Sequence, residues 1–177
     1  MKNIYIVVSQ TNSVVSRLLR HVTGDKYNHV SISFDENLSA MYSFGRIFAI
    51  TPIFGGFVRE SPAYGTMKKF IKTADIVILK LAVEEDTYLK INQHIAKMYS
   101  ERRKYHYNYI GLLLAKTGFY FHREKYFYCS EFVKDVLERF DVVGKDDFAQ
   151  IVRPMELLNI PGGKIIYQGK LLTYAGT

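Results

Sequence analysis

Apolar and polar residues alternate in the first half of the chain in patterns typical of β-strands. The stretch "NIYIVVSQ" (3–10) is almost continuously apolar and rich in β-branched residues, which predicts a buried strand. "HVSISF" (29–34) alternates apolar and polar side chains, and the turn sequence "DENL" separates it from "SAMYSFG" (39–45). This arrangement predicts a hairpin. "GGFVRES" (55–61) and "DIVILKLAV" (75–83) predict two further strands.

Helical spacing of apolar residues dominates the second half. Residues 84–105 carry an apolar stripe, with acidic residues first and basic residues last, as the helix dipole favours. "NYIGLLLAK" (108–116) predicts a short buried helix, and apolar residues recur at helical spacing after Cys129. The remaining predictions are a helix over 13–22 that ends at Gly24, a helical turn in "RPMELLNI" (153–160), and a final strand or hairpin in "GKIIYQGKLL" (163–172).

Strands come mostly first and helices mostly later, with no internal repeat, low-complexity segment or interior linker. This order predicts one α+β domain over residues 1–177, in which an antiparallel sheet packs against helices. The composition agrees, because 48% of the 177 residues are apolar and 15% are aromatic, which is typical of a chain with a packed core.

Several features predict a cytoplasmic protein without a transmembrane segment. The longest apolar runs, such as "IYIVV" and "IGLLLA", are far shorter than the roughly 18 residues that span a bilayer. The first residues, "MKNIYIVVSQTNS", lack the small-residue cleavage site of a signal peptide. The single cysteine cannot form an internal disulfide, so the chain is compatible with a reducing compartment.

The net charge of +7 favours anionic partners such as phospholipid, nucleic acid or polyanionic wall polymers. Its densest basic cluster, "SERRKYHYNY" (100–109), is typical of a solvated helix end, and no nucleic-acid motif accompanies it. We therefore expect no nucleic-acid partner. No glycine-rich phosphate loop and no zinc-ligand spacing are present, so we expect neither a cofactor nor a metal.

Cys129, in "YFYCSEFVKDVLERF", is placed in the first turn of a predicted helix. Unsatisfied backbone N–H groups and the positive end of the helix dipole favour a thiolate there, and the same groups could bind an oxyanion. The alternative is a small buried core cysteine, which is the commonest role of a lone cysteine. The polar neighbours Ser130 and Glu131 favour the reactive role.

A nucleophilic cysteine needs a base, and the chain has five histidines. His21 is predicted at a helix C-terminus and His94 within the long helix, where surface or structural roles are typical. His106 and His122 lie in tyrosine-rich loops, and their roles stay open. His29 begins a predicted strand, which is a rigid platform for a base.

The pair "NHVSISF" and "YFYCSEFV" resembles the circularly permuted cysteine-peptidase branch of the NlpC-type, papain-like thiol hydrolases. In that branch the histidine strand precedes the cysteine helix. The resemblance covers residues 27–140, and "RPMELL" is similar to the segment that often follows the cysteine helix. It implies a permuted papain-like fold, with Cys129 as the nucleophile and His29 as the base and later the general acid.

The resemblance also implies a third group that orients the imidazole. On the strand after His29, Ser43 is the best positional match, and Tyr42 is the next. Glu60 could reach the histidine from the following strand. A hairpin turn centred on "DENL" pairs His29 with Phe44 or Ser43, depending on a register that the sequence leaves open.

The implied activity is hydrolysis of an amide through an acyl-enzyme. The amide would be a peptide or isopeptide bond, for example one in a stem peptide of the cell wall. The first alternative is a thiol acyltransferase or lipase that acts on lipid acyl groups, and the second is a non-catalytic binding module of the same fold. The expected partner is therefore a peptide, a peptidoglycan fragment or a lipid. The sequence leaves the oligomeric state open.

Overall fold

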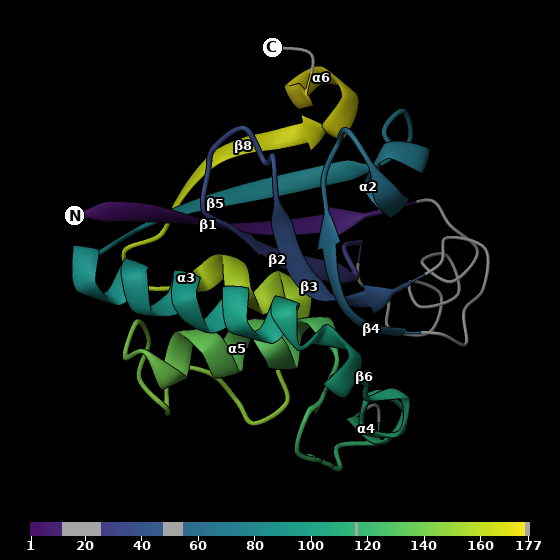
Figure 1. Ribbon diagram of the computed structural model, residues 1–177, viewed down its shortest axis with the longest axis vertical. Helices are drawn as coiled ribbons and strands as arrows, with labels where there is room; N and C mark the ends of the chain where they lie inside the picture. Colours follow the sequence, from purple (N-terminus) through teal and green to yellow (C-terminus); the bar gives the residue numbers. More distant parts are fainter. Residues whose placement is uncertain (12–25, 48–54, 116, 176–177) are drawn as a thin grey trace.

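An eight-stranded sheet organises the computed structural model, which describes residues 1–11, 26–47, 55–115 and 117–175. Across the sheet the strand order is β7-β6-β4-β3-β2-β1-β5-β8 (Figure 1). The strands are β1 (Lys2–Gln10), β2 (His29–Ser33), β3 (Met41–Arg46), β4 (Gly55–Glu60), β5 (Asp75–Val83), β6 (His106–Tyr107), β7 (Tyr126–Phe127) and β8 (Lys164–Lys170).

The sheet is mixed rather than purely antiparallel. Its central strands pair antiparallel, as the sequence predicts, but β6 and β7 are parallel. The connection between these two strands contains α4 (Tyr109–Ala115), and parallel neighbours require such a crossover connection. Both strands have only two residues, too few for a periodic sequence signal.

Helices cover both faces of the sheet. Figure 1 shows α3 (Glu85–Ser100) and α5 (Cys129–Arg139) side by side on one face, and the His94 and Phe140 rings of this layer lie 5.4 Å apart. The smaller core on the other face includes Met67 of α2 (Gly65–Lys69) and Leu171 of α6 (Leu171–Ala175). Two 3₁₀ helices complete the structure: η1 (Arg102–Lys104) and η2 (Pro154–Asn159).

Strand β1 lies in the middle of this arrangement and is buried on both faces, as predicted. Ile4 and Ile6 contribute to the core beneath α5, whereas Tyr5 and Val7 contribute to the core beneath α2 and α6. Alternate residues of a strand face opposite sides, so only a continuous apolar run can serve both cores.

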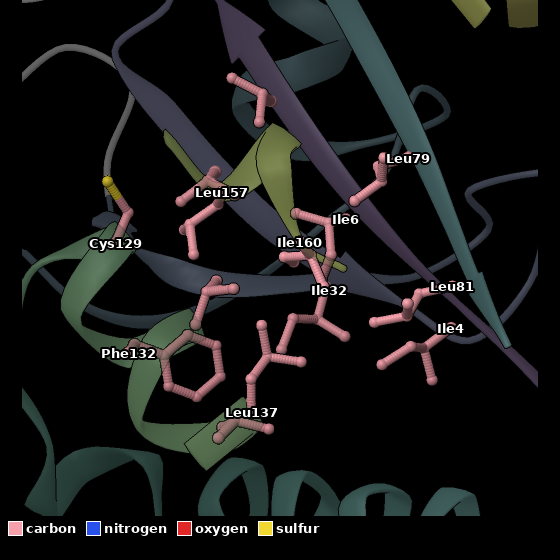
Figure 2. Close-up of a cluster of buried hydrophobic side chains, with 14 of the residues drawn as sticks. Ile4, Ile6, Ile32, Leu79, Leu81, Cys129, Phe132, Leu137, Leu157 and Ile160 are labelled. Carbon is pink, nitrogen blue, oxygen red and sulfur yellow. The ribbon is translucent and has the colours of Figure 1, made fainter. Parts of the chain in front are cut away.

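Helix α5 is fixed to the sheet by its apolar side. Figure 2 shows Phe132 and Leu137 turned toward Ile32 and Ile6 of the sheet, with Cys129 at the start of the helix. The Phe132 ring is fully buried, with its centroid 5.4 Å from that of Phe44 and 5.2 Å from that of Phe57. This packing determines where the tip of α5 meets β2.

The predicted strands over 3–10, 29–34, 39–45, 55–61 and 75–83 and the helices after residues 84 and 129 are confirmed. The prediction that "NYIGLLLAK" is buried is wrong, because α4 exposes Ile110 and Leu113. The segment 163–172 is a strand followed by the first turn of α6. The predicted helix over 13–22, with His21 and Gly24, lies outside the described residues. Within the described ranges, no helix combines the length and apolarity needed to cross a membrane.

We expect Phe132→Ala to lower the free energy of unfolding by about 3–5 kcal/mol, because it leaves a cavity between α5 and the sheet. Phe119→Ala removes the same side chain from an exposed position and should change it by less than about 0.5 kcal/mol. Denaturant unfolding of both variants measures the difference. Equal effects would contradict the packing described for α5.

Candidate active site

Cys129 is the first residue of α5, as the sequence predicts. Tyr128 precedes it in an extended conformation, with φ −100° and ψ 168°, and serves as the N-cap. The thiol is largely buried, and its Sγ lies 4.0 Å from the backbone oxygen of Asn28. The helix tip therefore presents the sulfur to the residue directly before His29.

His29 begins β2 and contacts two functional side chains. Its Nε2 lies 2.9 Å from Oε2 of Glu60, within hydrogen-bonding distance. The Cys129 thiol, whose Sγ lies against the backbone of the preceding residue, also raises the pKa of this ring. The His29 side chain is 18% exposed and that of Glu60 is 7% exposed, so this pair is shielded from most of the solvent. Cys129, His29 and Glu60 form the candidate active site.

The charge of Glu60 determines the protonation of His29. Burial lowers the pKa of His29, but the charge of Glu60 and the hydrogen bonds with Cys129 and Glu60 outweigh burial and raise the pKa to about 10. His29 is therefore an imidazolium at neutral pH, ion-paired with Glu60.

Small residues make room for Glu60, which must reach across the sheet because β3 separates β4 from β2. The Ser31 hydroxyl lies 3.5 Å from both His29 Nε2 and Glu60 Oε2. On β3, a Cβ atom at Gly45 would lie 3.4 Å from Cε1 of His29, so the ring packs directly over this glycine.

Ser43, the best positional match for the third group, makes its shortest hydrogen bond elsewhere in the structure. Ser43 Oγ instead donates a hydrogen bond of 2.6 Å to the backbone oxygen of Val30. The hairpin pairs Ser33 with Met41, and this register extends to place Ser43 opposite Ser31. Tyr42 stacks on Phe57, 6.3 Å between centroids, on the α3 side of the sheet. Glu60, the remaining alternative, is the group that reaches His29.

Two further residues near the site, Tyr107 and Arg46, were not predicted from the sequence. Burial raises the pKa of Tyr107 well above its usual range, and the charges of Cys129 and Tyr109 add to this effect, so its hydroxyl stays protonated. Burial lowers the pKa of Arg46, and the charge of Glu60 opposes that effect. Tyr107 lies on the two-residue strand β6, so no periodic pattern marks it.

A second histidine–glutamate pair holds the loop before β7 against the tip of α5. Glu131 is buried, and its Oε1 lies 3.0 Å from Nδ1 of His122. The same oxygen accepts a hydrogen bond of 3.4 Å from the Tyr120 hydroxyl. Its other oxygen accepts one from the backbone N–H of Tyr128 at 3.3 Å. Glu131 thus connects the first turn of α5 to residues 120–122.

Two further histidines within the described residues, His94 and His106, have contacts typical of structural residues. The His94 ring packs on Phe140, and burial, with the charges of Arg139 and Lys97, lowers its pKa. The His106 ring lies 5.0 Å from that of Tyr126. In the described part of the chain, no three His, Cys, Asp or Glu side chains are grouped so that they could hold a metal ion.

No protein-family model matches the chain, and no curated protein matches it either. The assignment of the site therefore depends on the geometry of Cys129, His29 and Glu60.

The His29–Glu60 pair predicts a pH dependence of stability. The pKa of His29 rises from 6.5 to about 10 on folding, so its contribution is complete below pH 6.5 and is lost as the pH rises through 10. In a Cys129→Ser background, which removes the titrating thiol, Glu60→Gln should remove a slope of up to about 1.4 kcal/mol per pH unit.

Denaturant unfolding between these two pH values measures the slope. Glu124→Gln, which removes an exposed carboxylate, is the matched control and should keep the slope of the background. A Glu60→Gln variant with an unchanged slope would show that the carboxylate does not hold the proton on His29.

Proposed function

We propose that the protein is a cysteine-dependent amide hydrolase that works through an acyl-enzyme. Cys129 is the nucleophile, His29 is the proton carrier, and Glu60 orients and charges the imidazole. The observation that supports this proposal is the placement of the Cys129 thiol at a helix N-terminus beside a histidine that a buried carboxylate holds at 2.9 Å. Triads of this kind are recognised by geometry and roles rather than by their order in the sequence.

In the proposed reaction, the Cys129 thiolate attacks the carbonyl carbon of the substrate. The carbonyl oxygen becomes an oxyanion, which the free N–H groups of the first turn of α5 stabilise. Glu60 occupies Nε2 of His29, so in the proposed reaction the remaining ring nitrogen, Nδ1, gives its proton to the leaving amine. In the second half, Nδ1 takes a proton from water, which attacks the thioester and releases the acid.

The proposed fold is a circularly permuted papain-like one. Two observations support it: the histidine strand β2 precedes the cysteine helix α5 in the chain, and α5 packs on the sheet that contains β2 and β3. The substrate class that follows is a peptide or isopeptide, including a fragment of peptidoglycan stem peptide.

Cleavage or transfer of a lipid acyl group is a second candidate function. The observation that favours it is the exposed apolar surface of α4, which follows β6 and Tyr107 directly in the chain. Thiol chemistry is the same for both, because an acyl group is transferred to Cys129 before it is passed to water or to another acceptor.

We expect the mass of the intact protein to increase by one acyl group when it is incubated with activated peptide esters, with the adduct on Cys129. Cys129→Ala and His29→Ala should abolish acylation. Glu60→Gln should slow it at least about tenfold, equivalent to about 1.4 kcal/mol, because the base loses its orienting charge.

Ser43→Ala is the matched control, because the Ser43 hydroxyl contacts the backbone of Val30 rather than the ring of His29. Its acylation rate should stay close to that of the unmodified protein. No acylation by peptide or lipid esters, together with equal alkylation of Cys129 in the presence and absence of His29, would favour the non-catalytic binding module.

A further inference from the structure

A patch of exposed apolar side chains covers α4 and the loop that follows it. The most exposed are Phe119 at 69%, Leu113 at 65% and Ile110 at 51%. Tyr109, Tyr120 and Phe121 extend the surface, and we call these six residues the apolar patch. Six of the twelve large apolar residues exposed in the described part of the chain are thus gathered between positions 109 and 121. Exposed apolar surfaces of this kind mark interaction sites.

The loop is folded back onto α4, so the patch is one surface. The Asn108 side chain donates a hydrogen bond of 2.9 Å to the backbone oxygen of Phe121, and it accepts one of 3.0 Å from the N–H of Gly111. A Cβ atom at Gly111 would lie 2.7 Å from that oxygen of Phe121, so glycine permits this close approach. The patch has a defined shape in the folded protein.

Basic residues are concentrated in the stretch of sequence that contains the patch. Residues 102–126, which include the patch, contain six Lys or Arg and one acidic residue, Glu124. Their net charge is therefore +5, compared with +7 for the whole chain. Glu124 lies 3.6 Å from Lys125, and Glu101, just before this stretch, pairs with Lys104. Arg123 stacks on Tyr126 with its guanidinium 3.8 Å from the ring centroid. The apolar patch therefore has a basic border.

We propose that the apolar patch and its basic border dock the protein onto the surface of an anionic lipid bilayer. The apolar side chains would enter the boundary between headgroups and acyl chains, while the basic residues stay at the level of the lipid phosphates.

Charge complementarity favours this partner over the two other candidates. A second copy of the chain would bring two surfaces of net positive charge together, which costs electrostatic energy. A nucleic acid or another polyanion would pair with the basic border but would leave the aliphatic side chains of Ile110 and Leu113 in water. A bilayer with acidic headgroups is the partner that uses both parts of the surface.

The patch lies next to the candidate active site. The Tyr109 ring lies 4.6 Å from that of Tyr107 on β6, and β6 pairs with β4, the strand that carries Glu60. On the other side, Tyr120 and His122 are bound to Glu131, two residues after Cys129. Docking would bring the Cys129 end of α5 toward the membrane. The proposal does not depend on a catalytic role for Cys129.

Cosedimentation with vesicles tests the proposal, using the full chain with Cys129→Ser so that no chemistry contributes. We expect binding to phosphatidylcholine vesicles that contain phosphatidylglycerol, weaker binding without phosphatidylglycerol, and release by salt. Leu113→Glu should weaken binding at least about tenfold. Its matched control is Leu89→Glu on α3, another half-exposed leucine on a helix, which should bind like the Cys129→Ser protein.

The basic border is tested separately by Arg103→Glu, which should weaken binding, with Lys164→Glu on β8 as the control that keeps it. Circular dichroism establishes that each variant is folded. Absence of binding to phosphatidylglycerol vesicles would overturn the proposal. So would equal losses in Leu113→Glu and Leu89→Glu, or binding of soluble polyphosphate that competes fully and is insensitive to Leu113→Glu. Acylation of Cys129 in the unmodified protein is measured independently, so either proposal can fail alone.

Discussion

The contact between His29 and Glu60 is the constraint on which the candidate site depends. The two residues come from strands that are not neighbours, so their side chains meet over β3, where Gly45 lies beside the ring. The carboxylate holds the ring by Nε2 and supplies the charge that keeps it protonated. A buried imidazolium without this partner would cost several kcal/mol, so the sheet register and the protonation state are inseparable.

A second carboxylate does for the nucleophile what Glu60 does for the base. Glu131 binds the backbone N–H of Tyr128 at the helix tip and the side chains of Tyr120 and His122 in the preceding loop. The sulfur is thus placed by one histidine–glutamate pair and faces another. Both carboxylates are largely buried, and each accepts or shares hydrogen bonds with side chains or backbone groups that hold it in place.

The sequence predicts the position of the helices and strands that have strong periodicity. It does not predict side-chain contacts that depend on how distant strands pair. The alternation in "HVSISF" and the spacing after Cys129 correctly locate β2 and α5, because those patterns follow from local burial. Glu60 could only be one alternative beside Ser43, since its contact depends on the hairpin register and on the reach of a side chain across β3. Tyr107 and the two-residue strands β6 and β7 have no local signal at all.

The one incorrect burial prediction is also the most informative. "IGLLLA" is apolar on every side, which is typical of a helix enclosed by a core, yet α4 is packed on its loop and leaves Ile110 and Leu113 in solvent. Exposed aliphatic side chains contribute nothing to the stability of the isolated chain, whereas burial of each would contribute about 1.5–3 kcal/mol. Contact with the lipid bilayer proposed above would remove these side chains from water, and the excess of Lys and Arg in the same stretch would favour acidic headgroups.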